Sequence, residues 1–310
     1  MQENNLTAVT ELFLLGFQGS RCLRIHLFCL LLLIYCGTIC GNLLIITLVS
    51  TSKNLHTPMY FFISQLSISD TLVISDIVPN LLYILWNNGG TITFAGCITQ
   101  LYILSTSELF ECFLLTVMSY DRYVAICNPL RYTSIMTSTY CVILTTTFWM
   151  SGSCFTLIYI ITVKNMIFCG PPITDHLFCD INSFVELSCS DTFIVDLETY
   201  LLSIPCVLIP TAIIVASYSY IIVAILRIPS SIGRQKAFST CSSHLIVVSL
   251  FYWTLFSVYI VPTKGLTLPI SKILSLLYTV FTPLVNPIIY SLRNKEIKKA
   301  IQVAVHKHWG

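Results

Sequence analysis

Seven mainly apolar stretches follow one another along the chain, separated by short polar segments. Each is long enough for the roughly 20 residues that cross the hydrocarbon core of a bilayer. No polar insertion is large enough for a separate domain, and no internal repeat suggests a transporter built from duplicated halves. The pattern predicts a single-domain, all-α membrane protein over residues 1–310, a bundle of seven helices. These helices are expected at residues 25–50, 58–86, 95–127, 140–163, 198–227, 237–262 and 270–291.

The two polar ends of the chain carry patterns of their own. Residues 1–24 lack the basic segment and short apolar core of a cleaved signal peptide, so we expect this tail to be retained. Asn5-Leu6-Thr7 is an acceptor for N-glycosylation, which requires an extracellular tail. Within residues 293–305, Ile297, Ile301 and Val305 are spaced four apart among lysines, which predicts an amphipathic helix on the inner leaflet.

Composition confirms the membrane class and excludes others. Hydrophobic residues make up 55% of the chain and charged residues only 10%, whereas a soluble domain has about a quarter of its residues charged. The net charge of +2, without a basic patch or a phosphate-binding glycine loop, excludes nucleic acid as a partner and leaves membrane lipids. The six histidines are scattered, and no nucleophile, base and acid converge. We therefore expect neither an enzyme nor a required cofactor.

The basic residues predict the orientation in the plasma membrane. With the N-terminus outside, eleven of the sixteen lysines and arginines fall on the inner face and five on the outer face. The same orientation places Cys97, Cys169, Cys179 and Cys189 on the oxidising side, where four cysteines allow three pairings. Three of them lie in the longest loop, about 164–197, which we expect to form an ordered lid.

Charged residues at membrane depth are costly and need an explanation. Asp121 and Arg122 end the third apolar stretch, either as a functional pair or as a helix end anchored by a snorkelling arginine. Asp70 and Glu111 form either a structural pair with one member protonated or an ion site. An ion-coupled transporter that uses Asp70, Glu108 and Glu111 is the alternative from another class of function.

Short motifs occur in order, one for each of six predicted helices. Together they resemble the olfactory receptors among the rhodopsin-like (class A) G-protein-coupled receptors, in particular the tetrapod-type class. A related receptor for a non-volatile molecule stays open as an alternative. The motifs are Gly41-Asn42, Leu55 to Phe62 with Asp70, Met118 to Cys127, Ser217-Tyr218, Lys236 to His244, and Pro283 to Tyr290.

The resemblance implies that a small odorant binds within the bundle and activates a stimulatory olfactory G protein, which raises cAMP. The helix after residue 237 begins near Arg234 and Lys236, so no acid there can restrain Arg122. Restraint is expected from Asp121 with help from His244. Pro287 is expected to form a hinge, or simply a passive kink. The implied switch residues are Asp121, Arg122, Tyr123, Tyr218, His244, Asn286, Pro287 and Tyr290. The implied polar core, which would hold a sodium ion, is Asn42, Asp70, Glu111 and Asn286.

Glu108 departs from the family, which usually has a small residue at this position. We expect it at the floor of the ligand pocket, facing a basic or hydrogen-bond-donating ligand, or else shaping the cavity as a protonated side chain. Trp253 also replaces a usual glycine and alters either the pocket or the lipid-facing surface. Core packing would explain the same apolar residues. By resemblance the pocket comprises Leu104, Ser105, Glu108, Leu109, Leu202, Ser203, Cys206, Phe251, Tyr252, Phe256 and Tyr259.

The resemblance also selects among the cysteine pairings. It implies one bridge between Cys97 and Cys179 and a second between Cys169 and Cys189. His176 with Cys179 and Asp180 can also be interpreted as a metal site, but a disulfide-bonded sulfur is a poor ligand, and we expect no metal there.

Overall fold

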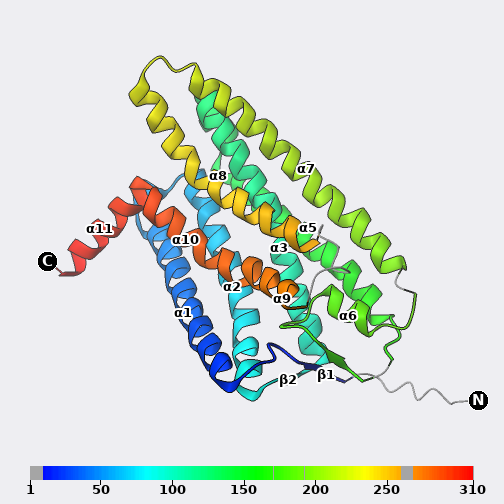
Figure 1. Cartoon of the computed structure of the whole chain (residues 1–310). Helices are drawn as coiled ribbons and strands as arrows, with labels where there is room; N and C mark the ends of the chain where they lie inside the picture. The colour runs from blue at the N-terminus through cyan, green and yellow to red at the C-terminus, as the bar shows by residue number, and fades with distance from the viewer. Residues whose placement is uncertain (1–9, 170, 192, 260–267, 310) are drawn as a thin grey trace, which may run out of the picture.

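The computed structural model describes residues 10–309 except 170, 192 and 260–267. Helices dominate it, and most lie side by side as a bundle (Figure 1). The first six spans are α1 (Arg21–Thr51), α2 (Pro58–Asn87), α3 (Phe94–Cys127), α5 (Ser138–Lys164), α7 (Phe193–Leu226) and α8 (Ser231–Tyr259). Their order and positions follow the hydrophobic pattern, with α1 beginning at Arg21 instead of residue 25 and α7 at Phe193 instead of residue 198.

The seventh span is not one uniform helix. It consists of α9 (Leu268–Leu276), a π-helical turn (Leu277–Phe281) and α10 (Thr282–Arg293), where the sequence predicts a single helix over 270–291. The wider turn interrupts the regular backbone ladder between the outer and inner halves of this span. After it, α11 (Lys295–Trp309) turns away from the bundle, where the sequence predicts an amphipathic helix over 293–305 (Figure 1).

Local sequence explains where the helices begin. Ser20, Thr93 and Thr137 cap α1, α3 and α5, each accepting a hydrogen bond from a backbone N–H of the first turn. Pro58 occupies the first position of α2, where its missing N–H costs no hydrogen bond. Short elements complete the inner and outer loops: α4 (Tyr132–Ile135), α6 (Ile181–Leu187) and 3-10 turns at Lys53–Leu55 and Pro129–Arg131.

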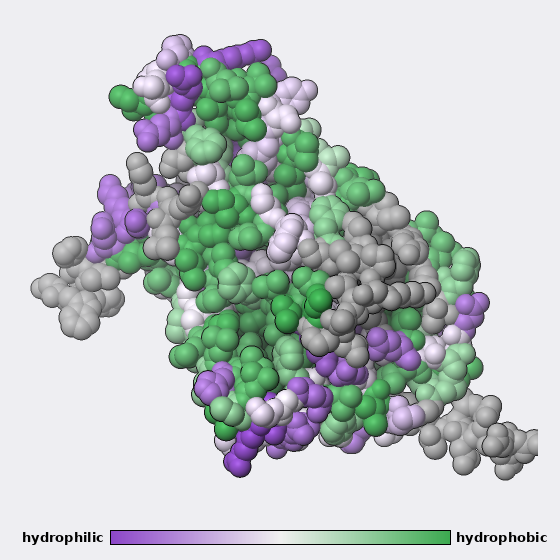
Figure 2. Space-filling model, in the orientation of Figure 1, coloured by the Kyte–Doolittle hydropathy of each residue, from purple (hydrophilic) through white to green (hydrophobic). Residues whose placement is uncertain are grey.

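The exterior of the bundle matches a lipid environment. Within the described residues, six helices are long and apolar enough to cross a membrane, and α8 adds a shorter apolar segment, Cys241–Phe256. Large apolar side chains such as Leu33 and Leu226 are 72% and 65% exposed. Figure 2 shows hydrophobic residues across the middle of the visible face and hydrophilic ones gathered toward its ends.

Small residues allow close helix contacts inside this shell. A Cβ added at Gly41 of α1 would lie 3.2 Å from the Pro287 side chain of α10. One added at Gly152 of α5 would lie 3.0 Å from the backbone oxygen of Thr106 in α3. Close contacts of this kind stabilise membrane bundles through packing, because lipid offers no hydrophobic drive between helices.

A three-stranded sheet covers part of the outer end, and the hydrophobic pattern gives no sign of it. β1 (Glu11–Leu14) comes from the tail, β2 (Gly90–Thr93) precedes α3, and β3 (Ile173–Thr174) belongs to the long outer loop. β1 lies in the centre, antiparallel to β2 and parallel to β3. Residues 11–14 of the tail are therefore part of the folded structure. Asn5, the predicted glycosylation site, lies outside the described residues.

Candidate ligand pocket and switch

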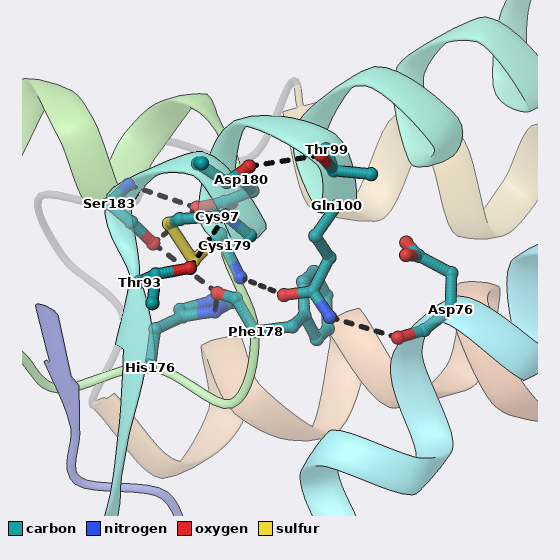
Figure 3. The surroundings of a disulfide bond; sticks show 12 residues. Asp76, Thr93, Cys97, Thr99, Gln100, His176, Phe178, Cys179, Asp180 and Ser183 are labelled. Carbon is teal, nitrogen blue, oxygen red and sulfur yellow. Dashed lines mark hydrogen bonds between the residues drawn. A yellow bond between two sulfur atoms is a disulfide. The ribbon is translucent and has the colours of Figure 1, made fainter. Parts of the chain in front are cut away.

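The long outer loop is fastened to the top of α3 as a lid. Disulfides join Cys97 to Cys179 and Cys169 to Cys189, with Cα atoms 5.3 and 5.8 Å apart, so the structure contains both expected bridges. Figure 3 shows Gln100 lying between the lid and α2. Its side chain accepts a 2.8 Å hydrogen bond from the Cys179 N–H and donates one of 3.1 Å to the backbone oxygen of Asp76.

The structure brings together part of the predicted ligand pocket. Cys206 of α7 is buried, as is Leu104 of α3. On α8, Phe251 and Tyr252 are buried in edge-to-face contact, and Tyr252 also packs against Phe256. Ser105, Glu108 and Leu109 are half-buried along α3. The side chains of Leu202, Ser203 and Tyr259 lie outside the described part of the chain.

Polar groups from three helices surround the inner side of these pocket residues. The buried Tyr252 hydroxyl lies among polar side chains, within hydrogen-bonding reach of Cys112 and Thr116 of α3 and Thr211 of α7. Cys112 lies in turn within electrostatic range of Glu108 and Cys206. A hydroxyl can rotate and both donate and accept, so this position can also form a hydrogen bond with a guest molecule.

Trp253 and two cavities lie outside the predicted pocket. Trp253 is 61% exposed on the outside of α8, so its bulk alters the lipid-facing surface and not the pocket. Two cavities are lined by described residues outside the predicted pocket. One of about 330 Å³ lies against Phe28, Tyr83 and Trp86 at the outer ends of α1 and α2, and one of about 10 Å³ lies beneath the lid.

The predicted polar core divides into two bonded groups. The Asn286 amide lies 3.2 Å from both carboxylate oxygens of Asp70, and Glu111 accepts a 3.0 Å bond from Ser69, the neighbour of Asp70 in α2. Asn42 instead donates to the Pro283 carbonyl at 3.2 Å, which ties α1 to α10. The amide oxygens of Asn42 and Asn286 have no partner among the described residues, so hard oxygen atoms are available for a small cation.

At the inner end of α3, Asp121 holds Arg122. The carboxylate is fully buried and accepts bonds of 3.0 and 2.6 Å from the Arg122 guanidinium. Its other oxygen accepts a 2.8 Å bond from the hydroxyl of Tyr132 in α4. A snorkelling anchor would leave the carboxylate exposed to water. The arrangement instead resembles a closed latch between α3 and the second inner loop.

Four other predicted switch residues, Tyr123, Tyr218, His244 and Tyr290, lie near this latch. His244 of α8 is buried, and its Nδ1 lies 2.5 Å from the Tyr218 hydroxyl of α7. The expected help from His244 is therefore directed at Tyr218, with no described hydrogen bond to Arg122. Tyr290 of α10 is also buried, and its hydroxyl has no partner among the described residues. Tyr123, the residue after Arg122, packs against Tyr220 of α7.

Sequence reasoning missed three residues that hold this site together. Tyr132 lies eleven positions after Asp121 in a short loop, where no periodicity identifies a partner. Gln100 is one polar residue at the top of a helix, and Lys272 was counted only as an outer positive charge. Their partners are distant in sequence: Lys272 bonds to Asp175, and Gln100 to the Cys179 N–H. Only the fold reveals such pairs.

The residues of the metal interpretation make other contacts in the lid. His176 uses its Nδ1 atom on the Phe178 carbonyl at 3.0 Å, while Cys179 is committed to its disulfide. Within the part of the chain that the structure describes, no group of three or more histidine, cysteine and acidic side chains could hold a metal ion.

Comparisons with known proteins point to one family. The olfactory receptor family model matches residues 28–308. Human olfactory receptor 11L1 is 43% identical over 310 residues, covering 100% of this chain and 96% of that protein. Human olfactory receptor 5AN1 is 44% identical over 298 residues, and mouse olfactory receptor 5p57 is 42% identical over 310. The match to receptor 5AN1 covers 96% of this chain and 96% of that protein. The match to receptor 5p57 covers 100% of this chain and 99% of that protein.

Among solved structures, squid rhodopsin superposes with a TM-score of 0.75 at 18% identity, covering 92% of this chain and 81% of that one. At this identity the likeness shows the fold alone, a rhodopsin-like seven-helix bundle. The family is shown by the sequence matches, which extend over nearly the whole chain. This chain therefore belongs to the olfactory receptor family, odorant-sensing G-protein-coupled receptors that cross the plasma membrane several times and are not enzymes.

Proposed function

We propose that this receptor binds a small amphipathic odorant between α3, α7 and α8, below the lid. The observation that carries this proposal is the half-buried Glu108, an acid within electrostatic range of Cys112, which in turn lies beside the buried Tyr252 hydroxyl. Apolar and aromatic walls with a few polar groups are typical of a small-molecule site. Glu108 would then select ligands that carry an amine or another hydrogen-bond donor.

Binding would bias the bundle between two states. In the resting state Asp121 and Tyr132 hold Arg122, as their hydrogen bonds support. In the active state Arg122 is released to a stimulatory olfactory G protein, and adenylyl cyclase raises cAMP. A ligand shifts such an equilibrium only as far as its affinity differs between the two states. A ligand that contacts both α3 and α8 would bind the two states with different affinity if these helices move relative to each other.

A sodium ion would stabilise the resting state from within the polar core. Asp70 and Glu111 supply carboxylate oxygens, and Asn42 and Asn286 supply amide oxygens that have no described partner. Hard oxygen donors suit a hard cation. The ion would neutralise charge that lipid cannot solvate and would keep α2, α3 and α10 in their resting arrangement.

Glu108→Gln tests the ligand class. An odorant panel of amines, acids, thiols and neutral carbonyl compounds is applied to cells with a cAMP reporter, with Glu186→Gln in the exposed outer loop as the matched control. A hydrogen bond to a charged group contributes about 1.5–3 kcal/mol. Amine agonists should therefore lose at least about tenfold in potency on Glu108→Gln, whereas neutral agonists keep theirs.

Two outcomes would count against the proposal. Identical agonist rankings and potencies in the wild type and Glu108→Gln, at equal surface expression, would remove Glu108 from recognition. A ligand-dependent flux of the odorant or of an ion without any cAMP response would favour transport over signalling.

A further inference from the structure

Lys272 is a buried cation at the outer end of the seventh span. Its residue is 5% exposed, in the first half of α9. Its ammonium group donates hydrogen bonds of 2.8 Å to the Gly16 carbonyl in the tail and 2.5 Å to Asp175 in the lid. A buried ammonium is tolerated only where oxygen atoms replace water around it. This one side chain therefore joins α9 to the tail and to the lid.

Both partners of Lys272 lead to the outer end of α3. Asp175 is four residues before Cys179, which is bonded to Cys97 in the first turn of α3. Gly16 follows β1, whose ladder with β2 ends directly before α3. Lys272 thus closes a ring between the outer ends of the third and seventh spans, above the predicted ligand pocket.

The position of Lys272 along the seventh span determines which half of the span the ring holds. Lys272 lies in α9, on the outer side of the π-helical turn, whereas Asn286, Pro287 and Tyr290 lie in α10 on the inner side. The side chain therefore fixes the outer half of the span to the lid. The inner half is connected to it through a turn of irregular backbone, a frequent site of functional bending.

We propose that Lys272 is a positioning residue that closes the lid and the tail strand over the ligand pocket and holds α9 still while α10 moves. We call the Lys272–Asp175–Gly16 contact the outer strap. It sets how long a ligand stays bound, because the lid cannot open until the ammonium leaves both oxygens. Asp175 is the weaker point of the strap, since its side chain is 32% exposed and water can replace it.

Hydrogen exchange tests the outer strap without any ligand. The amides of Phe13, Leu15 and Gly16 bond to carbonyls of residues 172, 174 and 176 in the lid. In purified full-length receptor without odorant, Lys272→Met should accelerate their exchange at least tenfold. The matched control, Lys164→Met, removes an exposed lysine at the outer end of α5 and should leave these rates unchanged.

A signalling arm tests the consequence for ligands, and it rests on the proposed function. The probe is the most potent agonist found in the odorant panel, and EC50 is compared at equal surface expression. Lys272→Met should raise EC50 at least tenfold, and Asp175→Asn by a smaller factor. The double variant should be no worse than Lys272→Met alone, because both substitutions remove the same interaction.

The two arms separate failure of the outer strap from failure of the proposed function. Exchange rates equal to wild type in Lys272→Met would overturn the strap whatever the signalling result, and so would additive effects of the two substitutions on EC50. If no odorant activates the wild type while exchange accelerates as expected, the strap stands and the proposed ligand class is wrong. If Lys272→Met fails to reach the surface, Asp175→Asn carries both measurements, and wild-type values in it overturn the strap.

Discussion

At the scale of single residues, the Asp121 carboxylate is held from two sides at the inner end of α3. It is fully buried and uses one oxygen for Arg122 and the other for Tyr132. Burial and the neighbouring negative charge of Asp121 raise the pKa of the Tyr132 phenol above its ordinary value. Because the raised pKa keeps the phenol protonated below pH 10, the hydroxyl can donate to Asp121 across the physiological range and loses its proton only in strong alkali.

Tyr132→Phe should raise basal signalling. Removing the phenol deletes one of the bonds that orient Asp121 against Arg122, a loss of about 1.5–3 kcal/mol for a charged acceptor. The active fraction in the absence of odorant should therefore increase by about tenfold or more, measured as basal cAMP at equal surface expression. Tyr140→Phe, an exposed tyrosine on α5, is the control. Unchanged basal cAMP in both variants would mean that Asp121 holds Arg122 without Tyr132.

At the scale of elements, hydrophobic length predicted the spans well because the bilayer imposes one dimension on all of them. The sheet escaped prediction because β1 and β3 have only four and two residues, and their pairing joins segments about 160 positions apart, a separation that periodicity cannot detect. The division of the seventh span escaped for another reason. A π-helical turn leaves the composition of a helix unchanged, so Leu277–Phe281 look like any apolar stretch.

The contact between α3 and α5 provides a prediction at this scale. Gly152→Val should place its first side-chain carbon about 3.0 Å from the Thr106 carbonyl and push the two helices apart. It would also disturb the 3.2 Å bond between Thr106 and Thr156. Overpacking of this kind typically costs about 1–3 kcal/mol, so surface expression should fall several-fold.

The control for this variant is Cys154→Val, two residues further along α5 and exposed on its surface. It introduces the same residue away from the contact, and flow cytometry of intact cells should show wild-type surface levels. If both variants reach the surface equally well, α3 and α5 are not held at the distance that Gly152 permits.

At the scale of the whole molecule, the polar core joins α1, α2, α3 and α10 through side chains that lipid could not solvate. The sequence identified Asn42, Asp70, Glu111 and Asn286 as members. It could not determine which of them bond, because a residue's depth in the membrane follows from its position but its partner depends on helix rotation. Asn42 bonds to a backbone carbonyl of α10, and Ser69 provides the hydrogen bond to Glu111.

Sodium should shift the equilibrium of the entire bundle if this core binds it. In isolated membranes that contain receptor and G protein, replacing sodium chloride with choline chloride at equal ionic strength should raise basal nucleotide exchange several-fold. Asp70→Asn removes one carboxylate and should abolish the difference between the two salts. Ser64→Ala, a change elsewhere on α2, should preserve it. Equal exchange in both salts for the wild type would mean that the core is held by hydrogen bonds alone.

The central position of β1 determines the order in which the receptor can be completed during synthesis. Residues 11–14 leave the ribosome before both of their partner strands, which follow at residues 90–93 and 173–174, and Lys272 follows later still. The tail therefore cannot form all of its contacts on the outer side of the membrane until nearly the whole chain has been made. Epitope tags placed before residue 10 leave that late step intact, whereas insertions within residues 11–16 should block the final stage of maturation.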